Sequence, residues 1–224
     1  MAINTEKYKA IINELAGKAT LVAVSKTKPV EDILALYHLG QRDFGENYVQ
    51  ELVDKQPQLP ADIRWHFIGH LQSNKVKQIA PFVHLIHGAD SFKLLQEINK
   101  QAAKLNKTID VLLQVHIAKE ETKFGLDEQE LDAIFSGDKK NEFALLANIR
   151  VEGLMGMASF TDDTSIIINE FKYIKSLFDK YAQFNIQNST FKILSMGMSS
   201  DYTIAIQQGS NMVRVGSLLF GART

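Results

Sequence analysis

The sequence predicts an α/β protein, a single-domain (β/α)8 TIM barrel, and three observations predict it. Short apolar runs rich in Val, Ile and Leu alternate along the chain with longer segments of helical periodicity, which is typical of parallel strands covered by helices. The apolar runs number eight, which favours a closed barrel. No GxGxxG follows the first run, so the alternative, an open Rossmann-like sheet, is less favoured.

The predicted strands are the apolar runs themselves, each bounded by polar or turn-forming residues. They cover Thr20–Lys26, Asp43–Asn47, Arg64–Gly69, Val83–His87, Ile109–Ile117, Ile149–Met157, Phe191–Met196 and Met212–Leu218.

Helical patterns precede the first strand and fill the longer gaps. The segments are Met1–Leu15, Val30–Leu39, Ser91–Leu105, Thr164–Tyr181 and one that begins near Asp201 and stops at Gly209. Gly40 follows the second segment, as glycine often follows the last residue of a helix. Asp162 or Asp163 precedes the fourth segment and can cap its first backbone N–H groups.

Composition excludes several classes of protein. The chain has 224 residues, 45% of them hydrophobic and 23% charged, with a net charge of -1 and no cysteine. We expect one domain over residues 1–224, without disulfides or thiolate metal sites. A near-neutral chain without a long apolar run predicts no nucleic acid partner, no membrane partner and no signal segment. The expected location is cytoplasmic.

The first predicted strand ends in lysines, in the stretch LVAVSKTKP. A single strand-end lysine often extends its ammonium group into water. The alternative is that Lys26 keeps a partly neutral amine that attacks a carbonyl and forms a Schiff base. If the strand continues to Lys28, alternation places both lysines on one face, and the second cation would lower the pKa of the Lys26 amine.

The last two predicted strands end in residues suited to an anion. Ser199 precedes a helical segment, Gly216 permits close approach of a phosphate, and Ser217 adds a hydroxyl. Each serine or glycine alone is equally well explained as a helix cap or a packing residue. Arg214 shares its strand face with Gly216, so it points into the barrel, unless it faces outward and pairs with a helix carboxylate.

Pyridoxal 5′-phosphate (PLP) needs an amine that forms an imine with it, a site that binds its phosphate and a partner for its ring nitrogen. The strand-end lysine, the two last strand ends and Arg214 together match these needs. The histidines predict no metal site, because His66, His70, His87 and His116 have no spacing that brings three or four ligands together.

The chain resembles the pyridoxal-phosphate homeostasis protein family, also described as alanine-racemase N-terminal-domain-like, from about Leu21 to Arg223. The matching motifs are AVSKTKP, FGENYVQE, WHFIGHLQSNK, the K-x-G-L of Lys123–Leu126, EGLMGMA, LSMGMSSD and VRVGSLLFGAR. The resemblance implies the barrel fold of alanine racemase and a cofactor held as an aldimine.

Residue by residue, the resemblance assigns Lys26 to the aldimine and places Asn47 beside the cofactor. It assigns Ser199, Gly216 and Ser217 to the phosphate, and Arg214 to the pyridine nitrogen. The family typically has threonine where this chain has Ser217, and the hydroxyl is retained.

The resemblance also implies a carrier that buffers or delivers PLP, exchanges it with apo PLP-dependent enzymes and affects amino-acid and keto-acid balance. We expect a monomer without efficient turnover. The alternative is a PLP-dependent amino-acid racemase, which needs an acid or base on each face of the substrate Cα. Lys26 can serve one face, but we expect the chain to lack the racemase domain that carries the second base, and neither Tyr48 nor Tyr202 has an evident reason to face the cofactor. A Schiff-base aldolase acting on a sugar phosphate is the third class that would use a barrel lysine.

Overall fold

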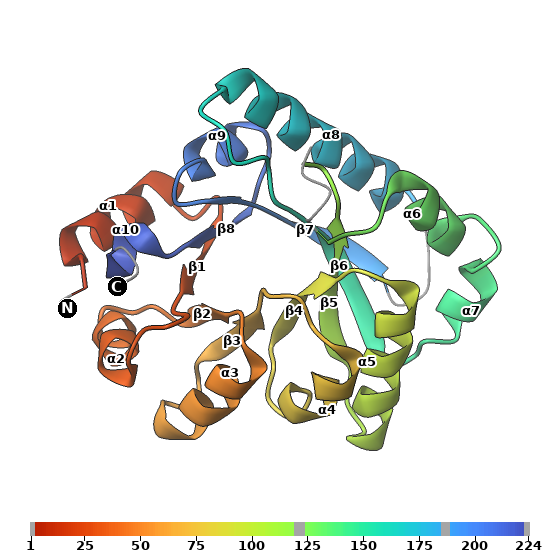
Figure 1. The fold of residues 1–224 in the computed structure, drawn as a ribbon, viewed down its shortest axis with the longest axis horizontal. Coiled ribbons are helices and arrows are strands. Elements are labelled where there is room, and N and C mark those ends of the chain that lie inside the picture. Colours follow the sequence, from red (N-terminus) through yellow and green to blue (C-terminus); the bar gives the residue numbers. More distant parts are fainter. Residues whose placement is uncertain (1–2, 119–123, 185–188, 222–224) are drawn as a thin grey trace.

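Eight parallel strands close into one barrel in the computed structural model, which describes residues 3–118, 124–184 and 189–221 (Figure 1). The strands are β1 (Thr20–Val24), β2 (Asp43–Glu46), β3 (Arg64–Phe67), β4 (Leu85–Ala89), β5 (Ile109–Val115), β6 (Ile149–Gly156), β7 (Ser189–Met198) and β8 (Met212–Val215). They pair in chain order, and β8 pairs with β1 to complete the ring. The predicted fold class is confirmed.

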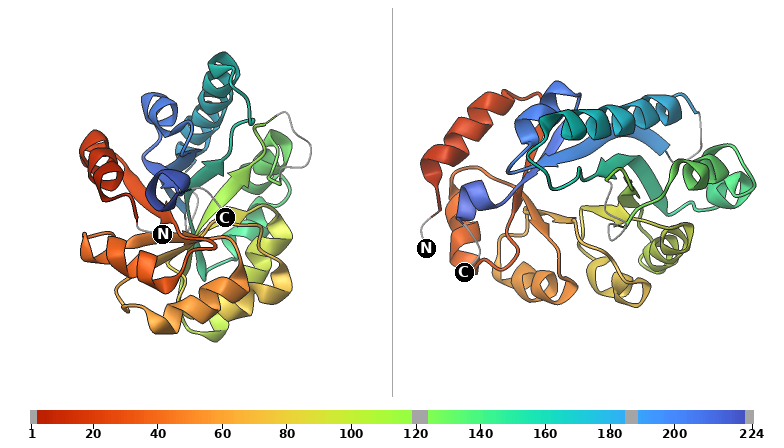
Figure 2. Two further views of the ribbon diagram at one scale, coloured as in Figure 1. Left: turned by 60° about the vertical axis from the view of Figure 1, so that its left-hand side comes forward. Right: turned by 45° about the horizontal axis from the view of Figure 1, so that its top comes forward.

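Helices surround the barrel on its outside, as the two views of Figure 2 show. They are α1 (Thr5–Leu15), α2 (Val30–His38), α3 (Val49–Lys55), α4 (Val76–Ile79), α5 (Phe92–Lys104), α6 (Glu128–Phe135), α7 (Lys140–Ala144), α8 (Thr164–Ala182), α9 (Tyr202–Gln207) and α10 (Ser217–Phe220). Two 3-10 turns, Gln56–Gln58 and Ser73–Lys75, adjoin α3 and α4. None of the described helices is long and apolar enough to cross a membrane.

Side-chain caps fix where the long helices begin. Ser91 accepts a hydrogen bond from the amide of Leu94 at the start of α5, and Asp163 accepts one from Ser165 at the start of α8. Each cap satisfies an amide that has no partner inside the helix. The sequence prediction offered Asp162 or Asp163, and the structure selects Asp163.

The main hydrophobic core lies between the outer faces of the strands and the helices, where side chains such as Phe44, Phe67 and Phe171 are fully buried. A smaller cluster fills the barrel interior. Its members are Val22, Leu85, Leu112, Met155 and Met212. Because side chains alternate along a strand, every second residue of each strand must fit into this interior.

Two predicted strand ends are wrong in a way that matters for the site. The first strand stops at Val24 and not at Lys26, because Lys26 and Thr27 form a turn. The last strand stops at Val215, and Ser217 and Leu218 belong to α10 and not to a strand. The other predicted strand ends lie within about two residues of the observed ones, a usual uncertainty for element boundaries.

Candidate functional site

A cavity of about 500 Å³ lies at the carboxyl ends of the strands, a size typical of pockets for small molecules. It is lined by Val24, Lys26, Lys28, Asn47, Ile68, Met157, Phe160, Met198, Ser199, Ser200, Arg214, Gly216, Ser217, Leu218 and Gly221. The structure therefore brings all six predicted site residues to one cavity: Lys26, Asn47, Ser199, Arg214, Gly216 and Ser217.

Sequence reasoning missed the apolar part of the lining. Ile68 lies two residues after the inward-facing His66, and Met157 lies two residues after Met155, which is buried inside the barrel. Both residues lie within the predicted strands, so alternation along those strands would have found them. Phe160 follows β6 at the cavity and is 95% exposed, and no periodicity predicts its position.

Lys26 is half-buried and sits in a tight turn. The amide of Lys28 donates to the carbonyl oxygen of Ser25 at 3.0 Å, and Thr27 has a left-handed backbone with φ of 61°. Threonine adopts this conformation only when its surroundings enforce it. Lys28 lines the same cavity, but the turn brings it there, so the argument from strand alternation was wrong.

A buried ion pair holds this turn from behind. Lys55 Nζ donates to the Ser25 carbonyl oxygen at 2.8 Å and pairs with Glu46 Oε1 at 2.8 Å. Lys55 Nζ also pairs with Glu51 at 2.6 Å, and Glu51 accepts the Thr27 amide at 2.6 Å. Burial raises the pKa of Glu46, while the charge of Lys55 opposes that rise. The backbone that carries Lys26 is thus fixed by α3.

Arg214 points into the barrel, as strand alternation predicted. It is 4% exposed. One guanidinium nitrogen donates to the carbonyl and hydroxyl oxygens of Ser195 at 2.8 and 2.6 Å, and the other donates to the Gly156 carbonyl at 2.9 Å. Burial lowers the pKa of Arg214 to about 10. The side chain therefore stays protonated at neutral pH and presents only hydrogen-bond donors to the cavity.

Ser199, Gly216 and Ser217 form one wall of the cavity. The amide of Gly216 donates to Ser199 Oγ at 3.1 Å and joins the segment after β7 to the segment after β8. A Cβ on Gly216 would lie 3.2 Å from both the Cβ and the carbonyl oxygen of Val24. A side chain would therefore crowd the base of the cavity. Two hydroxyls on one wall suit an anionic group.

Asn47 contributes a buried amide oxygen that has no hydrogen-bond partner among the described residues. Buried polar atoms are nearly always paired, so this oxygen fits a site that a ligand completes. The backbone after β3 passes so close that a Cβ on Gly69 would lie 2.3 Å from the Asn47 carbonyl oxygen. The backbone of Asn47 is therefore packed directly against the segment that follows β3.

The tyrosines considered as a second base do not line the cavity in the described part of the chain. Tyr48 is exposed to solvent. Tyr202 is buried and donates its hydroxyl to Glu14 at 2.7 Å. Burial, followed by the Glu14 hydrogen bond, raises the pKa of Tyr202 to about 12.

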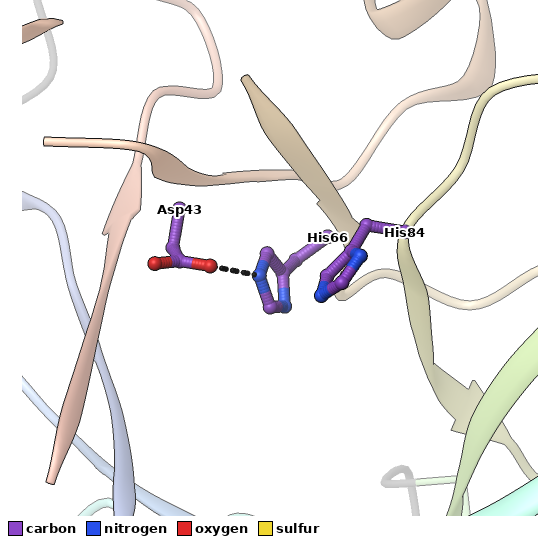
Figure 3. Close-up of side chains that lie close together, drawn as sticks. All are labelled: Asp43, His66 and His84. Carbon is purple, nitrogen blue, oxygen red and sulfur yellow. Dashed lines mark hydrogen bonds and ion pairs between the residues drawn. The ribbon is translucent and has the colours of Figure 1, made fainter. Parts of the chain in front are cut away.

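His66 and His87 are fully buried inside the barrel, and neither lines the cavity that contains Lys26. His66 instead lines a second cavity of about 330 Å³ at the opposite end of the barrel. Figure 3 shows His66 hydrogen-bonded to Asp43, with His84 beside its ring. Their ligand-type atoms lie within 4.8 Å of one another, a proximity that residue spacing did not predict. Arg64 donates to both carboxylate oxygens of Asp43.

Known protein sequences match nearly the whole chain. The model of the alanine racemase N-terminal domain matches residues 2–224. The pyridoxal phosphate homeostasis protein of Pasteurella multocida is 40% identical over 208 residues, which cover 91% of this chain and 86% of the relative. The K-x-G-L lysine, Lys123, and Arg223 of the last motif lie outside the described residues.

Solved structures share the fold of this chain. The structure of PipY from Synechococcus elongatus with PLP bound has a TM-score of 0.86 and 32% identity, and the match covers 96% of this chain and 99% of that one. Alanine racemase from Bartonella henselae has a TM-score of 0.70 at 16% identity, with 96% of this chain matched to 57% of that one, so it shares the fold.

The second cavity generates a prediction about acid stability. Burial alone would raise the pKa of Asp43, but hydrogen bonds from Arg64 and His66 and the charge of Arg64 lower it from 3.8 to about 2. A lowered pKa stabilises the fold above the ordinary value, and this stabilisation is lost as the pH falls toward the folded value. We expect wild type to exceed Asp43→Asn in unfolding free energy at neutral pH. This gap should shrink by about 2 kcal/mol between about pH 5 and pH 2.

Urea unfolding at stepped pH measures this gap, with fluorescence of the single tryptophan, Trp65, as the signal. A gap that stays constant over this range would show that the Asp43 carboxyl has an ordinary pKa.

Proposed function

This chain belongs to the pyridoxal phosphate homeostasis protein family, within the larger family of the alanine racemase N-terminal domain, and on that premise we propose that it binds PLP and takes part in PLP homeostasis. The observation that carries the proposal is the convergence of Lys26, two serine hydroxyls and the buried Arg214 on one cavity. The similar PipY was solved with PLP bound.

The cavity fits this cofactor in size and in donor set. Its volume of about 500 Å³ suits a small molecule. The amide oxygen of Asn47 lacks a partner in the described structure, and a Cβ on Gly216 would press on Val24. A cation, an amine, two hydroxyls and an apolar wall of Ile68 and Met157 match an anionic, aromatic aldehyde.

The residues divide the work of binding. When bound, PLP supplies an aldehyde that reacts reversibly with amines and a ring that withdraws electrons. Lys26 offers the amine from its fixed turn, and Asn47 offers a polar atom beside it. Ser199 and Ser217 would donate hydroxyl hydrogens to the phosphate, and Gly216 would leave room for it. Arg214 would direct its charge at the ring nitrogen.

Two features support a carrier over a racemase. Among the described residues no tyrosine lines the cavity, and Tyr202 is engaged with Glu14. Arg214 remains protonated at neutral pH, because burial lowers its pKa only to about 10. A fixed positive charge disfavours a proton on the ring nitrogen that faces it, and this weakens the ring as an electron sink.

We extend the proposal to the setting of the protein. The whole of residues 1–224 acts as one PLP-binding barrel, as a monomer in the cytoplasm. Its partners are PLP and apo PLP-dependent enzymes that receive the cofactor, and it affects amino-acid and keto-acid balance through them.

Lys26→Ala is expected to abolish covalent attachment of PLP while the fold survives. The reason is that the cavity then lacks the amine held by the turn. Absorbance spectroscopy should show that the band of the covalently bound cofactor is lost in the variant. An unchanged circular dichroism spectrum should show that the fold survives. Borohydride reduction and peptide mapping of wild type should place the pyridoxyl group on Lys26. Its recovery on another lysine would reject the assignment, and no cofactor absorbance at all would favour a sugar-phosphate aldolase.

Ser199→Ala and Ser217→Ala are each expected to weaken PLP binding. Each removes one hydrogen bond to a charged group, worth about 1.5–3 kcal/mol, so PLP affinity should fall about tenfold or more. Pyridoxal, which lacks the phosphate, is the control ligand and should bind these variants almost as it binds wild type. Equal weakening of both ligands in a binding titration would contradict a phosphate role for these hydroxyls.

The protein loaded with PLP is expected to produce at most trace D-alanine from L-alanine. We assign Lys26 as the base, and no tyrosine among the described residues lines the cavity. In deuterated water any Cα exchange should therefore proceed without inversion, far below the ordinary enzyme range of about 1–1000 turnovers per second. Mass spectrometry and chiral chromatography measure the two outcomes. Rapid D-isomer formation would overturn the carrier proposal and make Tyr48 and Tyr202 the first residues to mutate.

A further inference from the structure

Four hydrogen bonds connect Arg214 at the Lys26 cavity with Asp43 at the opposite end of the barrel. Arg214 donates to Ser195 Oγ at 2.6 Å, and Ser195 Oγ lies 3.1 Å from His87 Nδ1. His87 Nε2 lies 2.9 Å from His66 Nδ1, and His66 Nε2 lies 2.9 Å from Asp43 Oδ1. We call this chain of five side chains the relay.

The groups at the two ends set the direction of every hydrogen bond in the relay. An ionised carboxylate only accepts hydrogen bonds, and a guanidinium only donates them. Asp43 therefore requires a proton on His66 Nε2. With both rings neutral, His66 Nδ1 accepts from His87 Nε2, and His87 Nδ1 accepts from the Ser195 hydroxyl. All four donors then point from Arg214 toward Asp43, so their dipoles add.

The surroundings favour a neutral His87. Ser195, His66 and His87 are fully buried, and burial, together with the charge of Arg214, lowers the pKa of His87 well below its usual value. The ring of His84 lies edge-on to His66 with centroids 5.4 Å apart. The alternative is a doubly protonated His66, which would donate from both nitrogens and reverse the His87 ring. It would place a cation in a barrel interior that already holds Arg214.

We propose that Asp43, His66, His87 and Ser195 are positioning residues that orient Arg214 and tune how tightly the cavity retains its cofactor. The orientation of the relay concerns the protein alone, and its effect on retention rests on the proposed function. A polarised Ser195 hydroxyl directs its hydrogen at His87 and its lone pairs at Arg214. If Asp43 no longer fixed the tautomers, the hydroxyl would lose that preference and the guanidinium would lose part of its anchor.

The chain contains a matched control for Asp43. Asp110 also lines the second cavity and accepts two hydrogen bonds from one arginine, Arg150, at 2.9 and 2.8 Å. Arg64 and Arg150 have nearly equal side-chain exposures of 47% and 48%. Asp43→Asn and Asp110→Asn therefore each remove one negative charge from the same end of the barrel. Only the first removes a member of the relay.

The first arm of the experiment uses protein without cofactor and 15N-labelled histidine. The ring-nitrogen chemical shifts of wild type should show His66 and His87 neutral, with the proton on Nε2 of each. Asp43→Asn should shift both rings, and Asp110→Asn should shift neither. A doubly protonated His66, or equal shifts in the two variants, would overturn the relay.

The second arm measures the rate at which PLP leaves each protein. Each loaded protein is transferred to an excess of a reagent that captures the aldehyde of released PLP. Asp43→Asn loses a hydrogen bond that orients Arg214 through the relay, so PLP should leave this variant about three- to tenfold faster than wild type. The release rate of Asp110→Asn should stay within about twofold of wild type. Equal rates in the two variants would overturn the effect on retention. If wild type bound no PLP, the proposed function would fail, and the ring-nitrogen shifts alone would decide the relay.

Ser195→Ala provides a second variant in case Asp43→Asn does not fold, and thermal unfolding of all three identifies that case. It removes one small hydroxyl between His87 and Arg214. It should shift the His87 Nδ1 resonance and accelerate PLP release, and leave the His66 resonances close to wild type. An unchanged release rate in folded Ser195→Ala would also overturn the proposal.

Discussion

Burial of the Arg214 guanidinium inside the barrel is the interaction on which the candidate site depends. A charge out of water must have its hydrogen bonds satisfied by fixed groups. The acceptors here are the Ser195 carbonyl and hydroxyl and the Gly156 carbonyl. The pairing of β7 with β8 shifts register between Ser195 and Met198, next to these acceptors. Among the described residues Arg214 is the one arginine inside the barrel, and it lies next to this irregular part of the sheet.

Strand alternation predicted that Arg214 faces inward with Met212, because alternation depends only on neighbours in the chain. The positions of the other expected site residues at the strand ends, together with the family resemblance, predicted that the six share one cavity. The turn at Lys26 was not predictable in the same way. It depends on Lys55 and Glu51, which come from a helix about 25 residues later and meet Ser25 and Thr27 only in the closed barrel.

The histidines show the same limit more strongly. His66 and His87 looked like ordinary hydrogen-bonded residues, because their partners are remote in sequence. His87 meets Ser195 across a separation of 108 residues, and His66 meets Asp43 across 23. Such pairs follow from the order in which strands close into a ring, and no local pattern encodes them. Residue spacing predicts the inward faces of a barrel better than it predicts which inward side chains touch.

The two arginine–carboxylate pairs on the amino end of the barrel have a consequence for protein engineering. By the exposure of the arginines and the hydrogen bonds that they donate, the pair of Asp43 with Arg64 and the pair of Asp110 with Arg150 look alike. Asp110 has its arginine as the partner in that pair, whereas Asp43 also holds a fully buried histidine in place. A surface-charge redesign that treated both aspartates as equivalent would leave the interior intact at one position and disturb it at the other. Tolerance to substitution on this face is therefore set by what lies beneath each carboxylate.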